Sequence, residues 1–296
     1  MRKVICCALF ALATTFAPGA DKRPKITGID HVDFYTTSPE ANARLYMQLL
    51  GLMSGEPLEQ GQTQRFLVGE QFVGYRPASN PSATDRMDHV AFATDNCAAL
   101  RNYLAAKGLK VPESLSHLKE EPSFFVKDAE GHKIEFVERR IADTAITGKP
   151  VSRHIIHAGF IVHDRAAEDH FYRDILGFHL YWQGGMQTGK NDWVAMQVPD
   201  GTDWLEYMLN VEPNADQHTM GVMNHISLGV RDIKGAQAKL ESHGWKPHGE
   251  EKAQMGRDGK WQLNLYDPDF TRIELMEFKP AQKPCCSEFQ GKHPSD

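Results

Sequence analysis

Two histidines and two glutamates recur at a regular spacing in the second half of the chain. They are His157, Glu206, His225 and Glu274. Within each pair the histidine precedes its glutamate by 49 residues, and 19 residues separate the two pairs. Imidazole nitrogen and carboxylate oxygen suit a divalent ion of borderline softness, such as Zn, Ni, Mn, Co or Fe(II). Such an ion would keep positions open for water or substrate oxygens, so the sequence predicts one mononuclear centre here.

The first half carries a related but smaller set of residues. His31, His89 and Glu135 are two histidines and one carboxylate, the set that non-haem Fe(II) oxygenases use. In the strand at residues 72–76, Gly74 stands where a second carboxylate would be expected. This set is an alternative metal site, and the two sites do not exclude each other.

Strand alternation places these ligands on one face of a sheet. Side chains along a strand point to opposite faces in turn. In the strand that begins at His157, apolar Ala158 and Phe160 therefore share the face opposite the histidine. Glu206 and Glu274 each lie between two apolar residues, and a carboxylate so placed must face a polar partner, a metal or solvent. We expect the apolar face to pack on helices and the ligands to line the opposite, concave face.

The strands that carry the histidines belong to a fourfold repeat. Similar segments begin at His31, His89, His157 and His225. A residue suited to begin a helix follows in each segment, namely Ser38, Asp95, Asp164 and Asp232. A glycine suited to end that helix comes 19 or 20 residues after each histidine, at Gly51, Gly108, Gly177 and Gly244. Two or three β-like runs follow each helix. The sequence predicts an α+β fold of four βαβββ modules, paired into two cupped, mostly antiparallel, barrel-like sheets.

The repeat also predicts the domain organisation. One domain of two modules is expected over residues 25–140 and a second over residues 153–279. Residues 141–152 are expected to link them, and residues 280–296 to form a polar tail. Chains with two pairs of modules can complete their sites alone, and the sequence leaves the oligomeric state open, a homodimer included.

Composition narrows the partners and the compartment. A formal net charge of −6 without any basic block argues against a nucleic-acid surface. Residues 1–20 have the basic start, apolar run and small residues of a secretory signal peptide. We therefore expect a secreted or periplasmic protein without a stable membrane span after processing. Cys97, Cys285 and Cys286 would remain; they do not form a disulfide framework, and the tail pair is expected to be two ordinary thiols.

At these residues the chain resembles the vicinal oxygen chelate superfamily, over roughly residues 25–279. That superfamily includes glyoxalase I, extradiol ring-cleaving dioxygenases and metal-free bleomycin-resistance binders. The resemblance implies a cupped sheet with ligands from the first and last strands of each module. The second half looks most like glyoxalase I, since its run Glu206-Tyr-Met-Leu-Asn210 is similar to a run of that family whose asparagine contacts glutathione. The family's glutathione-binding arginine is replaced by Ile161, which argues against glutathione as the substrate.

Three classes of function follow from the resemblance. The first is a metal-dependent isomerase or lyase of glyoxalase type, acting on a small substrate that chelates the ion through adjacent oxygens. Its proton-transferring base would be Glu274, slightly favoured, or Glu206. The second is an extradiol-type Fe(II) dioxygenase, and the third is a metal-free small-molecule binding or resistance protein. From the sequence itself, Arg257 and Lys260 lie in a glycine-rich loop that could cover the site and bind an anionic substrate.

Overall fold

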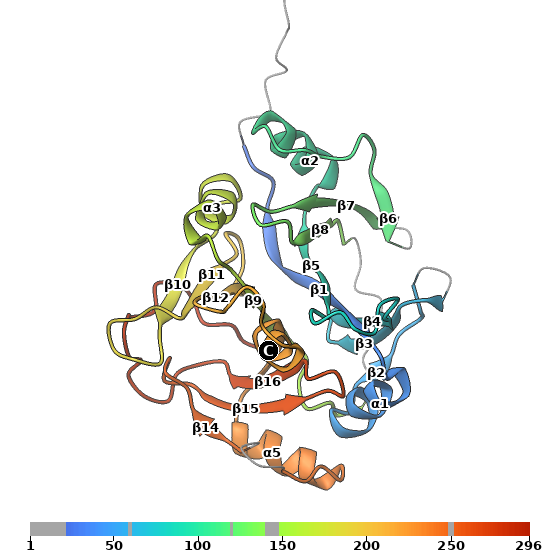
Figure 1. Cartoon of the computed structure of the whole chain (residues 1–296), viewed down its shortest axis with the longest axis vertical. Coiled ribbons are helices and arrows are strands. Elements are labelled where there is room, and N and C mark those ends of the chain that lie inside the picture. The colour runs from blue at the N-terminus through green and yellow to red at the C-terminus, as the bar shows by residue number, and fades with distance from the viewer. Residues whose placement is uncertain (1–21, 59–60, 119–120, 140–147, 248–251) are drawn as a thin grey trace, which may run out of the picture.

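The two halves of the chain each form an eight-stranded sheet (Figure 1). The computed structural model describes residues 22–58, 61–118, 121–139, 148–247 and 252–296. The predicted signal peptide and most of the predicted linker lie outside these residues. The strand order is β2-β3-β4-β1-β5-β8-β7-β6 in the first sheet and β10-β11-β12-β9-β13-β16-β15-β14 in the second. The predicted fold class is therefore confirmed.

Each module of the first half follows the predicted order of a strand, a helix and three strands. The first module consists of β1 (Ile26–Thr36), α1 (Pro39–Arg44), the π-helical turn η1 (Leu45–Leu49), β2 (Met53–Ser54), β3 (Gln64–Val68) and β4 (Gln71–Pro77). The second consists of β5 (Met87–Thr94), α2 (Cys97–Ala106), β6 (Ser116–Leu118), β7 (Glu121–Lys127) and β8 (Lys133–Val137).

The second half repeats this order with one added helix. The third module consists of β9 (Ile155–Ile161), α3 (Arg165–Asp169), the π-helical turn η3 (His170–Ile175), β10 (His179–Gly184), β11 (Trp193–Gln197) and β12 (Trp204–Met208). Helix α4 (Gln217–Met223) precedes the fourth module, which consists of β13 (His225–Val230), α5 (Ile233–Ser242), β14 (Gln254–Met255), β15 (Trp261–Tyr266) and β16 (Arg272–Glu277).

The pairing of the central strands positions the site. In the second sheet β9 pairs with β12 in parallel, β13 pairs with β16 in parallel, and the two first strands β9 and β13 are antiparallel neighbours. The first sheet repeats this with β1, β4, β5 and β8. The first and last strands of both modules are thus the four central strands of each sheet. Residues that the sequence separates by 49 positions come to lie on adjacent strands.

One continuous cluster of buried apolar side chains spans both halves. Val32 and Phe34 of β1 and Phe160 of β9 belong to it, on the face opposite the histidines as predicted. The ring of Phe92 on β5 packs edge-on against Phe178 of the third module, with centroids 5.3 Å apart. Burying the apolar faces of both sheets in a shared core leaves the polar faces for the sites.

The helix ends agree with the predicted pattern in part. Gly51, Gly108, Gly177 and Gly244 all adopt the left-handed conformation that ends a helix, with φ between 68° and 94°. The side chains of Asp164 and Asp232 cap α3 and α5. Ser38 is the N-cap residue of α1 as predicted, although its side chain makes no capping hydrogen bond; the predicted cap of α2 is wrong, because Asn96 and not Asp95 caps that helix. Asp95 accepts a hydrogen bond from the backbone of Lys25 instead, which ties the start of β1 to β5.

The predicted polar tail packs against the second sheet. The backbone N–H of Gln290 donates to the carbonyl of Tyr181, and Gln197 donates to the carbonyl of Lys292. Cys285 and Cys286 are bonded to each other, so the expectation of two ordinary thiols is wrong. The carbonyl of Cys285 accepts a hydrogen bond from the indole of Trp182, which holds the bonded pair against β10.

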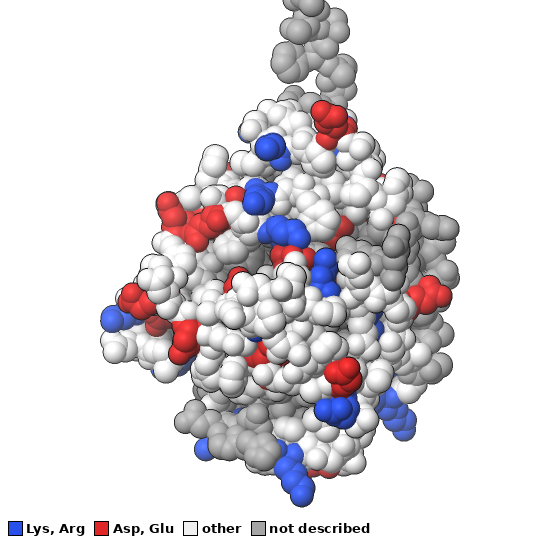
Figure 2. Space-filling model, turned by 45° about the vertical axis from the view of Figure 1, so that its right-hand side comes forward, with Lys and Arg blue, Asp and Glu red and all other residues white. Residues whose placement is uncertain are grey.

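Two features of the surface bear on possible partners. Figure 2 shows acidic and basic side chains interspersed over the face that it presents, without a continuous basic area. In the part of the chain that the structure describes, no helix is long and apolar enough to cross a membrane.

Candidate metal centre

Four predicted ligands converge on the concave face of the second sheet, one from each central strand. His157 Nε2 lies 3.1 Å from His225 Nε2 and 3.3 Å from a carboxylate oxygen of Glu274. Glu206 lies slightly farther away, 3.5 Å from His225 Nε2 and 3.9 Å from His157 Nε2. Two ligand atoms at about 2.1 Å from one ion are about 3.0 Å apart at right angles and about 3.4 Å apart at the tetrahedral angle. His157 therefore has the spacing of a common ligand with both His225 and Glu274, and the ligand atoms of these three residues all lie within 4.8 Å of one another.

A glycine makes room for this convergence. Gly159 lies across from His225 in the β9–β13 register, and a Cβ atom there would come within 2.1 Å of the His225 ring. Any larger residue at position 159 would displace the His225 imidazole from the centre. The small neighbour that the sequence places beside His157 thus has a steric role at the site.

The hydrogen bonds of His225 fix its tautomer. Its Nδ1–H donates to the carbonyl of Met223, so the lone pair of Nε2 faces the centre. Arg272 Nη2 donates to that lone pair at 2.8 Å, and an ion bound to His225 would take the place of this guanidinium. His157 Nδ1 is buried and has no hydrogen-bond partner among the described residues. Two imidazoles and two carboxylates are a donor set that fits a borderline divalent ion.

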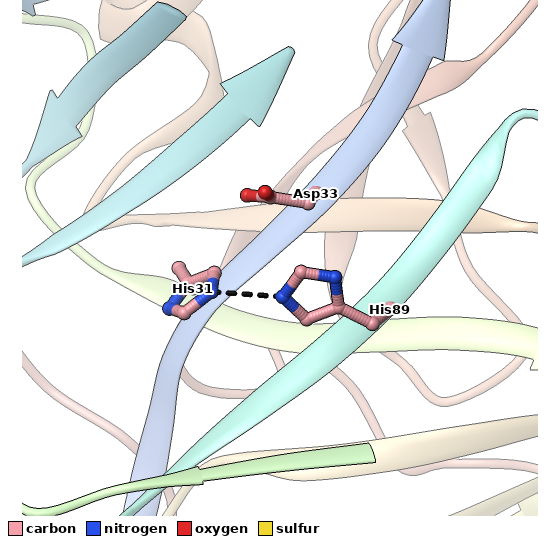
Figure 3. A group of neighbouring side chains, drawn as sticks. All are labelled: His31, Asp33 and His89. Carbon is pink, nitrogen blue, oxygen red and sulfur yellow. Dashed lines mark hydrogen bonds between the residues drawn. The ribbon is translucent and has the colours of Figure 1, made fainter. Parts of the chain in front are cut away.

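The three predicted residues of the first half also converge. His31 Nε2 lies 3.0 Å from His89 Nε2, and both nitrogens lie close to Glu135, at 3.2 Å and 3.3 Å. Figure 3 shows the two imidazoles, from β1 and β5, pointing toward each other with Asp33 beside them. The structure therefore brings together both predicted sets of ligands.

Comparison with known families identifies the fold. The family model described as the Glyoxalase/Bleomycin resistance protein/Dioxygenase superfamily matches residues 28–136 and again residues 154–275. The chain belongs to this superfamily. No curated protein sequence matches the chain.

Solved structures of this superfamily share the architecture of the whole chain. They include the 2,3-dioxygenase LapB from Pseudomonas sp. KL28, at 16% identity and a TM-score of 0.63, covering 90% of this chain and 98% of that one. Homoprotocatechuate 2,3-dioxygenase from Arthrobacter globiformis has 16% identity and a TM-score of 0.64, with 92% and 88% covered. BphC, a halotolerant catechol dioxygenase, has the same identity and TM-score, with 91% and 95% covered. At this identity the likeness shows the shared fold.

A cavity of about 350 Å³ opens above the second-half centre, with Glu206 and Glu274 in its wall. Its aromatic lining consists of Tyr181, Trp182, Trp193, Trp204 and Phe289. Phe289 comes from the C-terminal tail, and its contribution could not be foreseen from a segment that looks polar. Arg272, Gln262 and Asn264 add polar groups. The strand parity of Arg272 matches that of Glu274, a signal that could have placed this arginine at the site.

The other predicted substrate-binding residues have different positions. Arg257 lines the cavity, as predicted for its loop. Lys260 is fully buried, with its ammonium group 4.6 Å from the ring centre of Trp204 and 3.2 Å from the Tyr181 hydroxyl. It therefore supports the cavity wall and does not line the cavity. Asn210 is exposed, donates to Asp192 and to the carbonyl of Asn191, and is not among the residues that line the cavity. The expectation that it binds substrate is not supported by this position.

The two centres differ in charge. In the second half, burial lowers the pKa values of His157 and His225 well below the ordinary value, so both imidazoles are neutral. Burial, together with the nearby Glu274 carboxylate, raises the pKa of Glu206 to about 8. In the first half, burial alone would lower the pKa of His31, but hydrogen bonds to Asp30 and Glu135 raise it to about 10. The second-half cup thus disfavours carboxylate charge, whereas the first-half cup favours a cation.

Glu206→Gln should change the pH dependence of stability in the metal-free protein. The folded-state pKa of Glu206 lies above the ordinary 4.5, so its contribution to stability is full below pH 4.5 and is lost as the pH rises through about 8. The variant should match the wild type near pH 4.5 and exceed its free energy of unfolding by about 1–3 kcal/mol above pH 8. Urea denaturation with a chelator present measures this difference. Glu212→Gln, at an exposed glutamate, is the control, and a difference that stays constant with pH would contradict the expectation.

Proposed function

We propose that the second-half cup is the active site of a metal-dependent enzyme that moves a proton on a small substrate with two adjacent oxygens. The observation that carries this proposal is the convergence of His157, His225 and Glu274: His157 Nε2 lies 3.1 Å from His225 and 3.3 Å from Glu274, and Glu274 lines a cavity of about 350 Å³. Glu206 stands beside them as a carboxylate that is not needed to complete a three-residue set.

His157, His225 and Glu274 would hold the ion, with Glu206 as a fourth and more weakly held ligand. When bound, a divalent ion stabilises the negative charge that develops on substrate oxygens. Neutral imidazoles offer their lone pairs without first losing a proton, and Met223 orients one of them. The shared core behind the sheet keeps the four strands, and hence the ligands, in place.

Glu206 is the better candidate for the base. Its carboxylate lies farther from the imidazoles than that of Glu274, and its side chain is 13% exposed, against 4% for Glu274. A carboxylate that can turn toward the cavity can take a proton next to a carbonyl and return it one carbon away. In the metal-free protein, burial and the nearby Glu274 raise the pKa of Glu206 to about 8, toward the range of a base that works near neutral pH.

The cavity lining suggests the kind of substrate. Arg257 and Arg272 provide positive charge at a cavity whose wall also holds five aromatic residues and the carboxyl groups of Glu206, Asp258 and Glu274. A guanidinium group pairs well with carboxylate, phosphate or enolate oxygens. We propose a small oxygenated substrate with an apolar or planar body and an anionic group.

Proton exchange tests the proposal directly. The metal-loaded protein, incubated in D₂O with small α-hydroxycarbonyl and α-dicarbonyl compounds, should exchange a carbon-bound hydrogen, and NMR would detect the loss of that signal. A chelator should abolish exchange, and re-addition of the ion should restore it. A chelator that alters neither exchange, nor melting temperature, nor binding of these compounds would favour a metal-free binding or resistance protein.

An extradiol-type Fe(II) dioxygenase is the second candidate. His157, His225 and Glu274 are two histidines and one carboxylate, the set that non-haem Fe(II) oxygenases use. The solved catechol and homoprotocatechuate dioxygenases named above have the same fold over nine-tenths of this chain. This candidate predicts oxygen consumption with catechols by the Fe(II)-loaded protein, which an oxygen electrode measures. Proton exchange without oxygen uptake would exclude it.

A further inference from the structure

We propose that the first half holds a second, separate metal centre, formed by His31, His89, Glu135 and Asp33, which binds a divalent ion independently of the second half. His31, His89 and Glu135 come from β1, β5 and β8, the strands equivalent to those of three of the second-half ligands. Their ligand atoms are 3.0, 3.2 and 3.3 Å apart. All three distances lie in the range of about 3.0–3.4 Å expected for neighbouring ligands of one ion.

The Nδ1 atoms of His31 and His89 are hydrogen-bonded to carboxylates on the outer side of the cup, which points both Nε2 atoms into it. Nδ1 of His31 lies 2.7 Å from Asp30, and Nδ1 of His89 lies 2.9 Å from Asp88. A carboxylate accepts, so each Nδ1 carries a hydrogen and each Nε2 turns into the cup. The two Nε2 atoms and the Glu135 carboxylate thus face one another at 3.0–3.3 Å, an arrangement in which they can share either a proton or a divalent ion.

The fourth ligand has moved to a different strand. Gly74 on β4 stands where the repeat would place a carboxylate, and it has no side chain to offer. Asp33, the neighbour of Gly74 in the β1–β4 register, occupies that space: a Cβ atom on Gly74 would come within 1.9 Å of its carboxylate oxygen Oδ1. Oδ1 is buried without a hydrogen-bond partner among the described residues. One oxygen of Asp33 lies within 4.8 Å of the ligand nitrogens of both histidines. The donor set is again two imidazoles and two carboxylates.

The charges around the first-half cluster leave a net negative charge inside the cup, which suits a divalent ion. Asp30 and Asp88, which orient the histidines, are each paired with a cation, Arg139 at 2.6 Å and Lys133 at 2.8 Å. Glu135 and Asp33 then supply the negative charge inside the cup, against one partial contact of Asp33 with Arg76 at 3.3 Å. Carboxylates behind ligand histidines are the usual outer contacts of metal sites, because they fix the tautomer and increase the basicity of the ring. In the second half, by contrast, the outer partner of His225 is a backbone carbonyl.

Metal binding by the full chain tests the inference. The metal-stripped protein is titrated with Co²⁺ at pH 7.5, and bound metal per chain is measured by elemental analysis after gel filtration. We expect two equivalents for the wild type and one for Glu135→Gln. The matched variant Glu274→Gln should also retain one equivalent, and the double variant none. The visible d–d spectrum should differ between the two single variants, because the two ligand sets differ in geometry.

Milder variants separate a ligand role from a folding role. Asp33→Asn keeps the shape of the side chain and should weaken Co²⁺ binding to the first centre while leaving the second equivalent unchanged. Asp88→Asn removes only an outer carboxylate and should lower the affinity of the first centre by about 10- to 100-fold. An unchanged second equivalent shows that the shared core is still folded.

The outcomes distinguish this inference from the proposed function. One equivalent that Glu274→Gln removes and Glu135→Gln leaves intact would overturn the second centre and leave the proposed function standing. One equivalent with the reverse pattern would support the first-half centre and contradict the proposed active site. No bound metal in any protein at millimolar Co²⁺ would overturn both and indicate that protons occupy the two clusters.

Discussion

Replacing His225 with alanine is expected to release the ion of the second half and to lower kcat/KM by at least about 10³-fold, since losing several kcal/mol of charge stabilisation by a metal corresponds to a loss of that size. His225 is fully buried, and its Nε2 lies 3.1 Å from His157 Nε2 and 3.5 Å from Glu206. Removing the ring leaves two of the three close ligands and opens a space that water fills. Elemental analysis and steady-state kinetics with the substrate found by proton exchange measure the two effects.

The control for this variant is a histidine outside both cups. The side chain of His170 is 70% exposed, and His170→Ala should leave metal content and kcat/KM unchanged. The first-half centre should keep its equivalent in His225→Ala, so the variant should bind one ion instead of two. Activity within a factor of about three of wild type in His225→Ala, with the protein folded, would show that the second-half cup is not the active site.

The four-module fold and the convergence of the ligands could be predicted because both follow from strand periodicity. One register places each histidine on the face opposite Val32, Phe160 or their equivalents, and burial of those apolar residues then fixes the direction of the histidine. Since the first and last strands of each module pair in parallel, ligands far apart in sequence become neighbours. A periodic signal repeated four times is hard to mistake.

Features that depend on contacts between unrelated segments could not be predicted. The C-terminal tail is largely polar in sequence, yet Phe289 and the bonded pair Cys285–Cys286 pack beside the cavity, because the edge strand β10 offers the partners Tyr181 and Trp182. Asp33 could not be recognised as a ligand candidate because its position depends on the space that Gly74 leaves on a different strand. Nor could the conformation of Asn210 be foreseen: its backbone turns into the left-handed region at φ 61° just after β12, and its side chain does not line the cavity.

The two candidate metal centres differ in their surroundings, although the same repeat forms both. The first-half centre is surrounded by paired charges. The Phe72 ring stacks on His31, with centroids 4.3 Å apart, and the Phe125 ring lies edge-on to His89, with centroids 5.1 Å apart. The second-half centre has fewer outer carboxylates, and its cavity has two arginines and an aromatic lining; the cavity of about 320 Å³ beside the first-half centre is reached by His89 and Asp88. Tight outer contacts favour a firmly held ion, whereas the more exposed Glu206 carboxylate in the wall of an aromatic cavity favours exchange of substrate and transfer of protons. This contrast is the reason for assigning catalysis to the second half.

Glu206→Gln provides the sharpest test of that assignment, because it separates holding the ion from moving the proton. The amide keeps the size of the side chain, and His157, His225 and Glu274 remain to bind the ion, so metal content should stay at the wild-type value. An amide cannot accept the proton, and we expect kcat to fall by about 10²- to 10⁴-fold, the usual contribution of a general base. KM should change little, since Arg257 and Arg272 still line the cavity.

The same variant distinguishes the two candidate chemistries. If Glu206 transfers a proton, Glu206→Gln should abolish hydrogen–deuterium exchange at the substrate carbon while the protein still binds its ion. If the protein is a dioxygenase that uses only His157, His225 and Glu274, oxygen uptake with catechols should survive the change nearly intact. Glu274→Gln is the complementary variant: its carboxylate lies 3.3 Å from His157 Nε2, closer than Glu206, so it should lose the second-half ion and both activities together. Loss of metal in Glu206→Gln with retention in Glu274→Gln would reverse the two roles, making Glu274 the base and Glu206 the permanent ligand.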